Sequence, residues 1–268
     1  MSVVGQGSWE IEAAREADAI AALRRGLDLG LTHIDTAEMY GNGTSEKVVG
    51  KAIRDRRDDV FLVSKVLPSN ASRRGTLRAC DKTLQNLQTD HLDCYLLHWR
   101  GPVPLSETVD AFLTLQREGK IRSWGVSNFD VEDLDKLASI SAQPACNQVL
   151  YHLGERTIEH AVIPWCAAHD VAVVAYTPFG QSTSFYDATT PGGRVLHQVA
   201  ERRGATARQT ALAFLLRNPD VFVIPKAARI AHVQDNAGAG DLQLDAADIA
   251  AIDAAFKRGA PKKHLPMI

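Results

Sequence analysis

Four side chains that can hold or transfer a proton lie at or just after short apolar runs: Asp35, Tyr40, Lys65 and His98. A tyrosine hydroxyl has an ordinary pKa of about 10, and a nearby ammonium group favours the phenolate and lowers that pKa. We therefore expect Lys65 to lower the pKa of Tyr40. Asp35 would keep Lys65 charged and fixed, and an imidazole N–H of His98 would orient a carbonyl oxygen. Together they would donate a proton to a carbonyl oxygen while another reagent attacks its carbon.

Each of these residues also has a structural explanation. A buried Asp–Lys pair is often a structural ion pair, a tyrosine at the start of a loop is often a packing residue, and a single histidine usually fills a core or surface position. The occurrence of all four on separate segments, each at the end of an apolar run, favours the chemical interpretation.

Such a site needs a scaffold that brings distant segments to one rim. The chain alternates short β-rich runs with helical patterns and has no linker that would divide it. Eight runs are typical of strands: 3–7, 31–35, 60–65, 92–98, 121–127, 145–149, 171–176 and 221–225. Strands separated by helices run parallel, so the pattern predicts an α/β protein, one (β/α)8 TIM-barrel domain over residues 1–268. An open Rossmann sheet is disfavoured because Gly5 and Gly7 lack the third glycine of G-x-G-x-x-G.

In a parallel barrel, catalytic side chains come from the carboxyl ends of the strands. Further polar residues occupy such ends in the later strands: Ser127, Asn128, Gln148, Tyr176 and Lys226. We therefore expect these residues at the same mouth as the first four.

Apolar periodicity predicts the outer helices. The first has an apolar series with Gly30 as its stop: Ala13, Ala17, Ile20, Leu23 and Leu27. One helix is surplus to the repeat: it begins at an Asp245 cap, has Asp248 three residues later, and has the apolar positions Ile249, Ile252 and Phe256. We expect the remaining tail, 257–268, to be a loosely held surface segment that contributes little to a binding pocket.

The composition is that of a globular protein: 268 residues, 45% hydrophobic, with 30 Lys and Arg against 32 Asp and Glu, a formal charge of −2. It argues against disorder and against a nucleic-acid partner. No apolar run reaches the roughly 18 residues of a membrane span and the start does not resemble a secretion signal, so we expect a cytoplasmic protein with no membrane partner. Cys80, Cys94, Cys146 and Cys166 form no C-x-x-C pair, and H-E-x-x-H is absent. We expect neither disulfides nor a metal.

An ordered set of motifs resembles the aldo-keto reductases. It comprises DTAEMYG at 35–41, SE at 45–46, VG at 49–50, VSKV at 63–66, LDCYLLHW at 92–99 and GKIRSWGVSNF at 119–129. It continues with NQV at 147–149, AYTP at 175–178 and IPKA at 224–227, and so covers nearly the whole chain. The resemblance implies an NAD(P)H-dependent oxidoreductase that reduces aldehydes and ketones on a TIM barrel, without a metal.

The resemblance also implies roles for individual residues. Tyr40 would protonate the carbonyl oxygen, with Asp35, Lys65 and His98 around it. The nicotinamide carboxamide would be bound by Ser127, Asn128 and Gln148, with Tyr176 stacked on the ring. At the other end, Lys226 would meet the adenosine 2′-phosphate and Asn236 the adenine, and this retained lysine favours NADPH over NADH.

Two departures from the family pattern lie near that lysine. Ala227 replaces a residue that is often Ser or Thr, and His232 stands where an arginine is common; Arg229 would be the substitute cation. A third departure is at the start, where the expected β-hairpin at the bottom of the barrel is missing. We expect this to expose core residues without abolishing the site.

The substrate pocket is expected between Trp9, Met39 and Trp99, with additional aromatic residues available at Phe179, Phe185 and Tyr186. Such walls suit small or aromatic carbonyls, and the motifs most resemble bacterial members that reduce methylglyoxal and other aldehydes. Two alternatives remain open: a cofactor-sensing regulatory subunit with little turnover, and an inactive truncated barrel. We expect a monomer or a weak homo-oligomer with a small-molecule carbonyl substrate.

Overall fold

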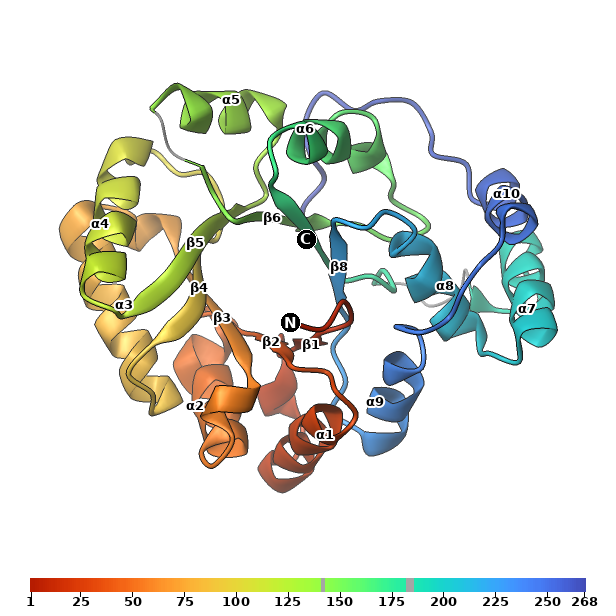
Figure 1. Cartoon of the computed structure of the whole chain (residues 1–268), viewed down its shortest axis with the longest axis horizontal. Helices are drawn as coiled ribbons and strands as arrows, with labels where there is room; N and C mark the ends of the chain where they lie inside the picture. Colours follow the sequence, from red (N-terminus) through yellow and green to blue (C-terminus); the bar gives the residue numbers. More distant parts are fainter. Residues whose placement is uncertain (141–142, 182–185) are drawn as a thin grey trace.

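Eight parallel strands stand side by side in sequence order around a central axis (Figure 1). The computed structural model describes residues 1–140, 143–181 and 186–268. The strands are β1 (Gln6–Gly7), β2 (His33–Asp35), β3 (Phe61–Val66), β4 (Leu92–Leu97), β5 (Ile121–Ser127), β6 (Cys146–Leu150), β7 (Ala172–Tyr176) and β8 (Val221–Ile224). Parallel bridges from Val4 to Val223 and from Gly7 to Lys226 join the first strand to the last. The predicted (β/α)8 barrel is confirmed.

The strands form where the sequence is apolar on both faces, because the barrel interior and the surrounding helices each exclude water. Inside the barrel, one small cluster packs together: Val63, Cys94, Leu96, Cys146, Val174 and Ile224. A much larger cluster lies between the strands and the helices. All four cysteines are buried free thiols.

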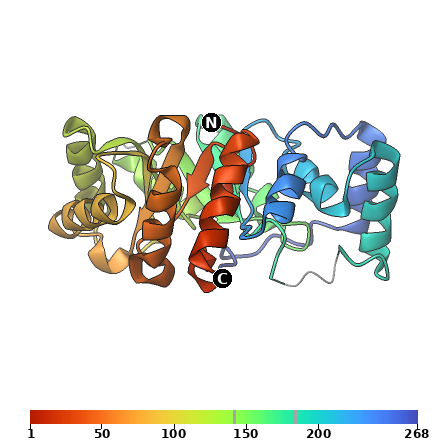
Figure 2. The ribbon, with the colours of Figure 1, turned by 90° about the horizontal axis from the view of Figure 1, so that it is seen from below.

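Ten helices occur in the described ranges, and they surround the barrel (Figures 1 and 2). They are α1 (Glu16–Asp28), α2 (Thr44–Ile53), α3 (Arg73–Leu87), α4 (Leu105–Arg117), α5 (Val131–Ser139), α6 (Val162–Ala168), α7 (Pro191–Arg203), α8 (Ala207–Leu215), α9 (Ile230–Ala237) and α10 (Ala246–Ala255). No helix in these ranges is long and apolar enough to cross a membrane.

The predicted face of the first helix is partly wrong. Helix α1 begins only at Glu16; Ala13 lies in a preceding 3₁₀ turn and Ala17 is exposed. The buried face consists of Ala19, Ala22, Leu23, Gly26 and Leu27. Because alanine fits exposed helix positions as well as buried ones, an alanine series does not by itself fix the face of a helix.

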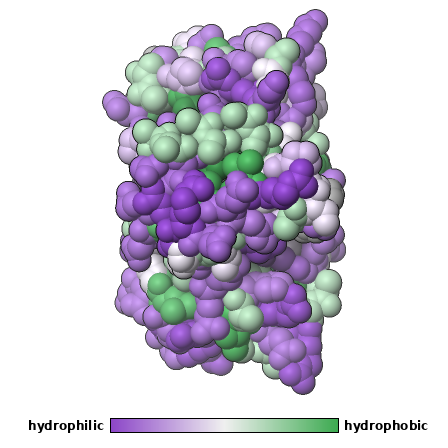
Figure 3. Space-filling view, turned by 90° about the vertical axis from the view of Figure 1, so that its right-hand side faces the viewer, coloured by the Kyte–Doolittle hydropathy of each residue, from purple (hydrophilic) through white to green (hydrophobic). Residues whose placement is uncertain are grey.

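Two helices, not one, are surplus to the repeat. Asp245 caps α10 as predicted, by accepting a hydrogen bond from the backbone N–H of Asp248, and Ile252 is fully buried. The Asp248 carboxylate also pairs with α7, at 2.7 Å from Arg202 and 2.5 Å from Arg203. Helices α7 and α10 therefore pack together outside the barrel (Figure 1). On that side of the molecule, hydrophobic surface is broken up by hydrophilic side chains (Figure 3).

The tail after α10 is held in place, contrary to our expectation. The Lys262 ammonium lies 2.5 Å from the Glu155 carboxylate, and the His160 ring lies 3.1 Å from the Gly259 carbonyl oxygen. The segment runs from α10 back to the barrel axis, where Met267 and Ile268 line the central cavity (Figure 1). The sequence expectation was wrong because these anchors lie about a hundred residues earlier in the chain.

The two termini lie at opposite ends of the barrel (Figure 2). No β-hairpin precedes β1 in the described residues. The Ser2 backbone N–H instead donates to the Thr32 hydroxyl at 3.1 Å, and the His33 N–H donates to the Ser2 hydroxyl at 3.3 Å. Val4 and His33 are each only 1% exposed, whereas Val3 is 39% exposed and Phe61 and Phe222, near the amino ends of β3 and β8, are only partly buried against the barrel interior. The expected exposure of core residues at this end is therefore only partial.

Buried His33 makes the stability of the fold depend on pH. Burial is the main cause that lowers its pKa from 6.5 to about 4. The unfolded chain therefore takes up a proton between these pH values and the folded chain does not. The contribution of His33 to the free energy of unfolding is fully present above pH 6.5. It falls by about 3 kcal/mol as the pH drops towards 4. Denaturant titrations at several pH values should show a shallower decline for His33→Gln.

The matched control is His264→Gln, which changes an exposed histidine in the tail. Its unfolding free energy should decline with the wild-type slope. A His33→Gln protein that also keeps the wild-type slope would show that His33 takes up its proton within the fold.

Candidate active site

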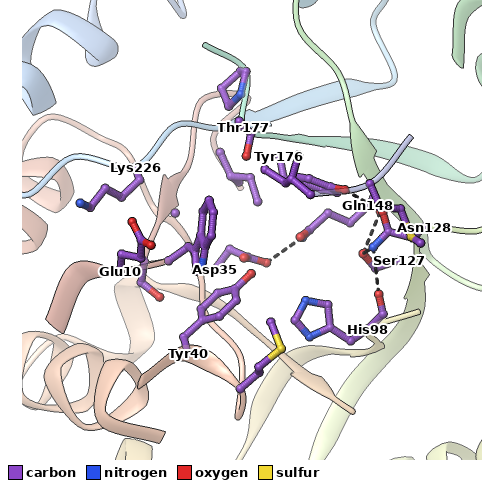
Figure 4. A pocket seen from close by; sticks show the side chains of 18 of the residues that line it. Glu10, Asp35, Tyr40, His98, Ser127, Asn128, Gln148, Tyr176, Thr177 and Lys226 are labelled. Carbon is purple, nitrogen blue, oxygen red and sulfur yellow. Dashed lines mark hydrogen bonds between the residues drawn. The ribbon is translucent and has the colours of Figure 1, made fainter. Parts of the chain in front are cut away.

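A cavity of about 550 Å³ opens at the mouth of the barrel, within the usual range for small-molecule sites. It lies among the loops that follow the strands, as Figure 4 shows. Its lining includes eight of the predicted catalytic and cofactor residues: Asp35, Tyr40, His98, Ser127, Asn128, Gln148, Tyr176 and Lys226. The barrel therefore brings together side chains that are up to about 190 residues apart in the sequence.

The predicted proton-transfer residues are in contact. The Lys65 ammonium donates to the Asp35 carboxylate at 2.5 Å, to the Thr36 carbonyl oxygen at 2.8 Å and to the Tyr40 hydroxyl at 3.1 Å. Lys65 is fully buried and Asp35 is 1% exposed. The three donor positions of the ammonium are thus all used, and the tyrosine oxygen is fixed against a positive charge.

The pKa values of Lys65 and Tyr40 are both raised, but for different reasons. Burial alone would lower the pKa of Lys65, but the Asp35 carboxylate and Tyr40 outweigh it and raise that pKa. Burial raises the pKa of Tyr40, and Lys65 offsets this only in part. Our expectation of a lowered Tyr40 pKa is therefore wrong in its net direction, because desolvation of the phenolate exceeds the attraction of the ammonium. At neutral pH Tyr40 holds its proton.

His98 lies beside Tyr40, with the ring centroids 5.8 Å apart in an edge-to-face arrangement. Burial, and secondly the charge of Lys65, lower its pKa to about 2. The imidazole is therefore neutral and carries one N–H. Its Nδ1 atom is buried without a hydrogen-bond partner among the described residues. A neutral ring beside the tyrosine suits hydrogen bonding to a substrate oxygen better than it suits proton uptake.

A second set of hydrogen bonds fixes the opposite wall of the cavity. The Gln148 side-chain amide donates to the other Asp35 oxygen at 2.7 Å, and the Ser127 hydroxyl donates to the backbone carbonyl oxygen of Gln148 at 2.9 Å. The Tyr176 hydroxyl donates to the Asn128 side-chain oxygen at 2.8 Å (Figure 4). Asn128 has a φ of 60°, a left-handed conformation that asparagine tolerates. This wall is therefore continuous with the Asp35–Lys65 pair.

The residues predicted to bind the adenosine end of the cofactor are less closely grouped. Lys226 is exposed and lines the cavity, whereas Arg229 and Asn236 do not line it. The Arg229 guanidinium lies 2.6 Å from the His232 ring. Asn236 is buried, and its side-chain oxygen has no hydrogen-bond partner in the described part of the chain. A buried acceptor without a partner is costly unless a ligand supplies the donor.

The predicted substrate walls are present, and sequence reasoning missed some residues beside them. Trp9, Met39 and Trp99 line the cavity, as does Phe179. Tyr186 lies behind Phe179, with ring centroids 5.6 Å apart, and Phe185 is outside the described residues. Residues missed from the sequence are Glu10, Thr177, Met267 and Ile268. Their positions follow from loop and tail conformation, for which the sequence carried no periodic signal.

No three His, Cys, Asp or Glu side chains lie together within the described ranges in a way that could hold a metal ion.

Glu38 connects the loops on which the site depends, a role that sequence reasoning also missed. Its backbone N–H donates to the Lys65 carbonyl oxygen at 3.3 Å. Its carboxylate accepts hydrogen bonds from the Leu67 N–H at 2.6 Å and from the Asn70 amide at 3.0 Å. The Tyr40 loop is thereby tied to the end of β3.

Replacing Glu38 by alanine should loosen this connection. We expect the free energy of unfolding to fall by about 1 kcal/mol, because the partly buried Leu67 N–H loses its acceptor. Amide hydrogen exchange should quicken at Leu67 and through residues 37–43. Glu38→Gln keeps one carbonyl oxygen and should stay near wild type. Faster exchange at Leu67 alone, with 37–43 unchanged, would contradict a link to the Tyr40 loop.

Comparisons with known proteins agree with the motifs and the geometry. The model of the aldo/keto reductase family matches residues 3–257. The methylglyoxal reductase YeaE of Escherichia coli (strain K12) is 44% identical over 272 residues, which cover 100% of this chain and 95% of that protein. A glyoxal reductase of Bacillus subtilis (strain 168) is 32% identical and covers 94% of this chain and 88% of its own length.

Solved structures agree as well. An aldo/keto reductase from Klebsiella pneumoniae, crystallised in complex with NADP and acetate, superposes with a TM-score of 0.93 at 46% identity and covers 99% of this chain and 95% of that one. An aldo/keto reductase from Brucella melitensis has a TM-score of 0.81 at 33% identity, with coverages of 94% and 93%. The family resemblance of the sequence is confirmed: the chain belongs to the aldo/keto reductase family and is an oxidoreductase.

Proposed function

We propose that this protein reduces small aldehydes and ketones to alcohols with NADPH, and that Tyr40 is the general acid. The contact that carries the proposal is the 3.1 Å approach of the buried Lys65 ammonium to the Tyr40 hydroxyl, with the Asp35 carboxylate paired to the same ammonium. This arrangement lies at the strand ends of a barrel, where catalytic groups of such folds are found.

The residues at the mouth fit NADPH. Tyr176 offers a ring held by Asn128 at one end of the cavity, and Lys226 offers an exposed cation at the other. The buried Asn236 side-chain oxygen, which has no hydrogen-bond partner among the residues that the structure describes, would accept a hydrogen bond from an adenine amino group. Ser127 and Gln148 would face the carboxamide, and Arg229 would add charge near the 2′-phosphate. The Klebsiella relative with bound NADP supports the same cofactor.

When bound, NADPH would supply the hydride to the carbonyl carbon. Tyr40 holds its proton at neutral pH, because burial raises its pKa, and would transfer that proton to the carbonyl oxygen. Lys65 would stabilise the phenolate that remains, and Asp35 keeps Lys65 charged. Neutral His98 would hydrogen-bond the same oxygen and so hold the carbonyl in position.

The pocket suits small and aromatic carbonyls. Trp9, Met39 and Trp99 line it, and Lys65 neutralises the Asp35 carboxylate beside Tyr40. Such walls favour apolar or uncharged substrates over sugar phosphates. The 44% identical relative is named a methylglyoxal reductase, and another relative a glyoxal reductase. We therefore place reactive dicarbonyls and aryl aldehydes first among the candidate substrates.

A panel of carbonyls, assayed with NADPH and NADH side by side, tests this proposal. We expect turnover of methylglyoxal and aryl aldehydes, with NADPH preferred. Tyr40→Phe should bind NADPH with wild-type affinity and lose most of the reduction, by about a hundredfold or more, because it lacks the donated proton. If methylglyoxal is not consumed but aryl aldehydes are, the dicarbonyl assignment falls. If Tyr40→Phe loses NADPH binding instead, Tyr40 is structural.

A further inference from the structure

The cavity carries little positive charge for a ligand with several phosphate charges. NADPH has a pyrophosphate and a 2′-phosphate. Among the described residues that line the cavity, Lys226 is the one with a permanently cationic side chain. Two of the lining side chains are carboxylates. That of Asp35 is neutralised by Lys65, which leaves that of Glu10. The net formal charge of these four side chains is zero.

The backbone places Glu10 on the same side of the mouth as Lys226. Gly7, at the end of β1, forms a parallel bridge with Lys226 across the seam where the barrel closes. Glu10 follows three residues later in a left-handed conformation with φ of 56°. Figure 4 shows Glu10 and Lys226 together on the side of the cavity away from His98.

Neither of these charges is neutralised by a structural partner. Glu10 and Lys226 are both exposed, and neither side chain forms an ion pair or hydrogen bond with any other residue that the structure describes. Elsewhere on this surface, carboxylates do find partners, as Glu16 does with Lys51 at 2.7 Å. The Glu10 side chain therefore has no evident role in holding the fold.

We propose that Glu10 is an affinity-setting residue: its carboxylate repels the phosphates of NADPH and NADP⁺ and competes with them for Lys226. This inference rests on the proposed function, because it assumes that the phosphates lie along the Lys226 side of the mouth. Its consequence is a weaker hold on the cofactor and faster release of NADP⁺ after each turnover. Release of a product is the slow step in many enzymes.

The physical basis is Coulomb repulsion between like charges at a cleft. Removing one negative charge should tighten binding, and reversing its sign should tighten it further. Salt should reduce both effects, because the screening length falls from about 10 Å at 0.1 M to about 3 Å at 1 M. A purely steric change at Glu10 would not depend on salt in this way.

The test uses the series Glu10→Gln and Glu10→Lys. Neither substitution introduces a glycine or a β-branched residue at this left-handed position, so the backbone cost stays nearly constant. NADPH fluorescence titration at low salt should give a dissociation constant roughly fivefold lower at each step. Stopped-flow displacement should show NADP⁺ leaving more slowly by a similar factor. Both differences should shrink at about 1 M salt.

Glu201→Gln and Glu201→Lys are matched controls. Glu201 is an exposed carboxylate on α7 and does not line the cavity. These variants change the net charge equally and should leave NADPH affinity at the wild-type value. Equal tightening by the Glu201 variants would show a global charge effect and overturn the local one.

The outcomes separate this inference from the proposed function. Wild-type protein that binds no NADPH overturns the proposed function itself. Wild-type protein that binds NADPH, with Glu10→Gln and Glu10→Lys binding it equally or more weakly, overturns only the inference. Tightening that persists unchanged at 1 M salt overturns it too, because the effect is then not electrostatic.

Discussion

The buried ion pair between Asp35 and Lys65 is the interaction on which the site depends. Removing two charges from water costs several kcal/mol per ion, and close contact repays this only if their other hydrogen-bonding positions are also satisfied. Here they are. The second Asp35 oxygen accepts from Gln148, and the ammonium also donates to the Thr36 carbonyl and to Tyr40. The pair is satisfied only because β2, β3 and β6 converge at one mouth.

This requirement links the chemistry to the fold. Lys65, which pairs with Asp35, holds the Tyr40 hydroxyl. Gln148, which also contacts Asp35, connects it to the wall of the cavity that contains Ser127 and Tyr176. A closed barrel brings β6 within reach of β2 across its interior. In an open sheet with the same strand order, the two strands would be far apart. The proposed acid and the proposed cofactor wall are therefore parts of one hydrogen-bonded group centred on Asp35.

Much of this architecture could be predicted from the sequence. Buried parallel strands read as apolar runs, and polar residues at their ends identified Asp35, Lys65 and Gln148 as neighbours. The net shift of the Tyr40 pKa could not be predicted, because it depends on how much water the folded loops exclude. The tail escaped prediction because its anchors are long-range contacts such as Lys262 with Glu155.

Helix α7 and Glu10 escaped prediction for local reasons. The first turn of α7 contains Pro191, Gly192 and Gly193, which weaken a helical pattern in the sequence. The place of Glu10 at the mouth follows from one left-handed residue, which no periodic pattern indicates. The conformation of a single residue can thus determine which charged side chains line a cavity, and that conformation is known only from the folded structure.

The proposed chemistry requires that the Lys65 ammonium acts directly on the Tyr40 proton. The most direct measurement is a pH titration of Tyr40 by NMR in protein carrying ¹³C-labelled tyrosine, with the Tyr40 signal among the 5 tyrosines assigned from its absence in a Tyr40→Phe sample. Wild type would be compared with an Asp35→Asn, Lys65→Met double variant, which removes both charges and leaves no unpaired ion. We expect a higher Tyr40 pKa in the variant, because the ammonium no longer favours the phenolate. An unchanged or lower Tyr40 pKa would contradict it.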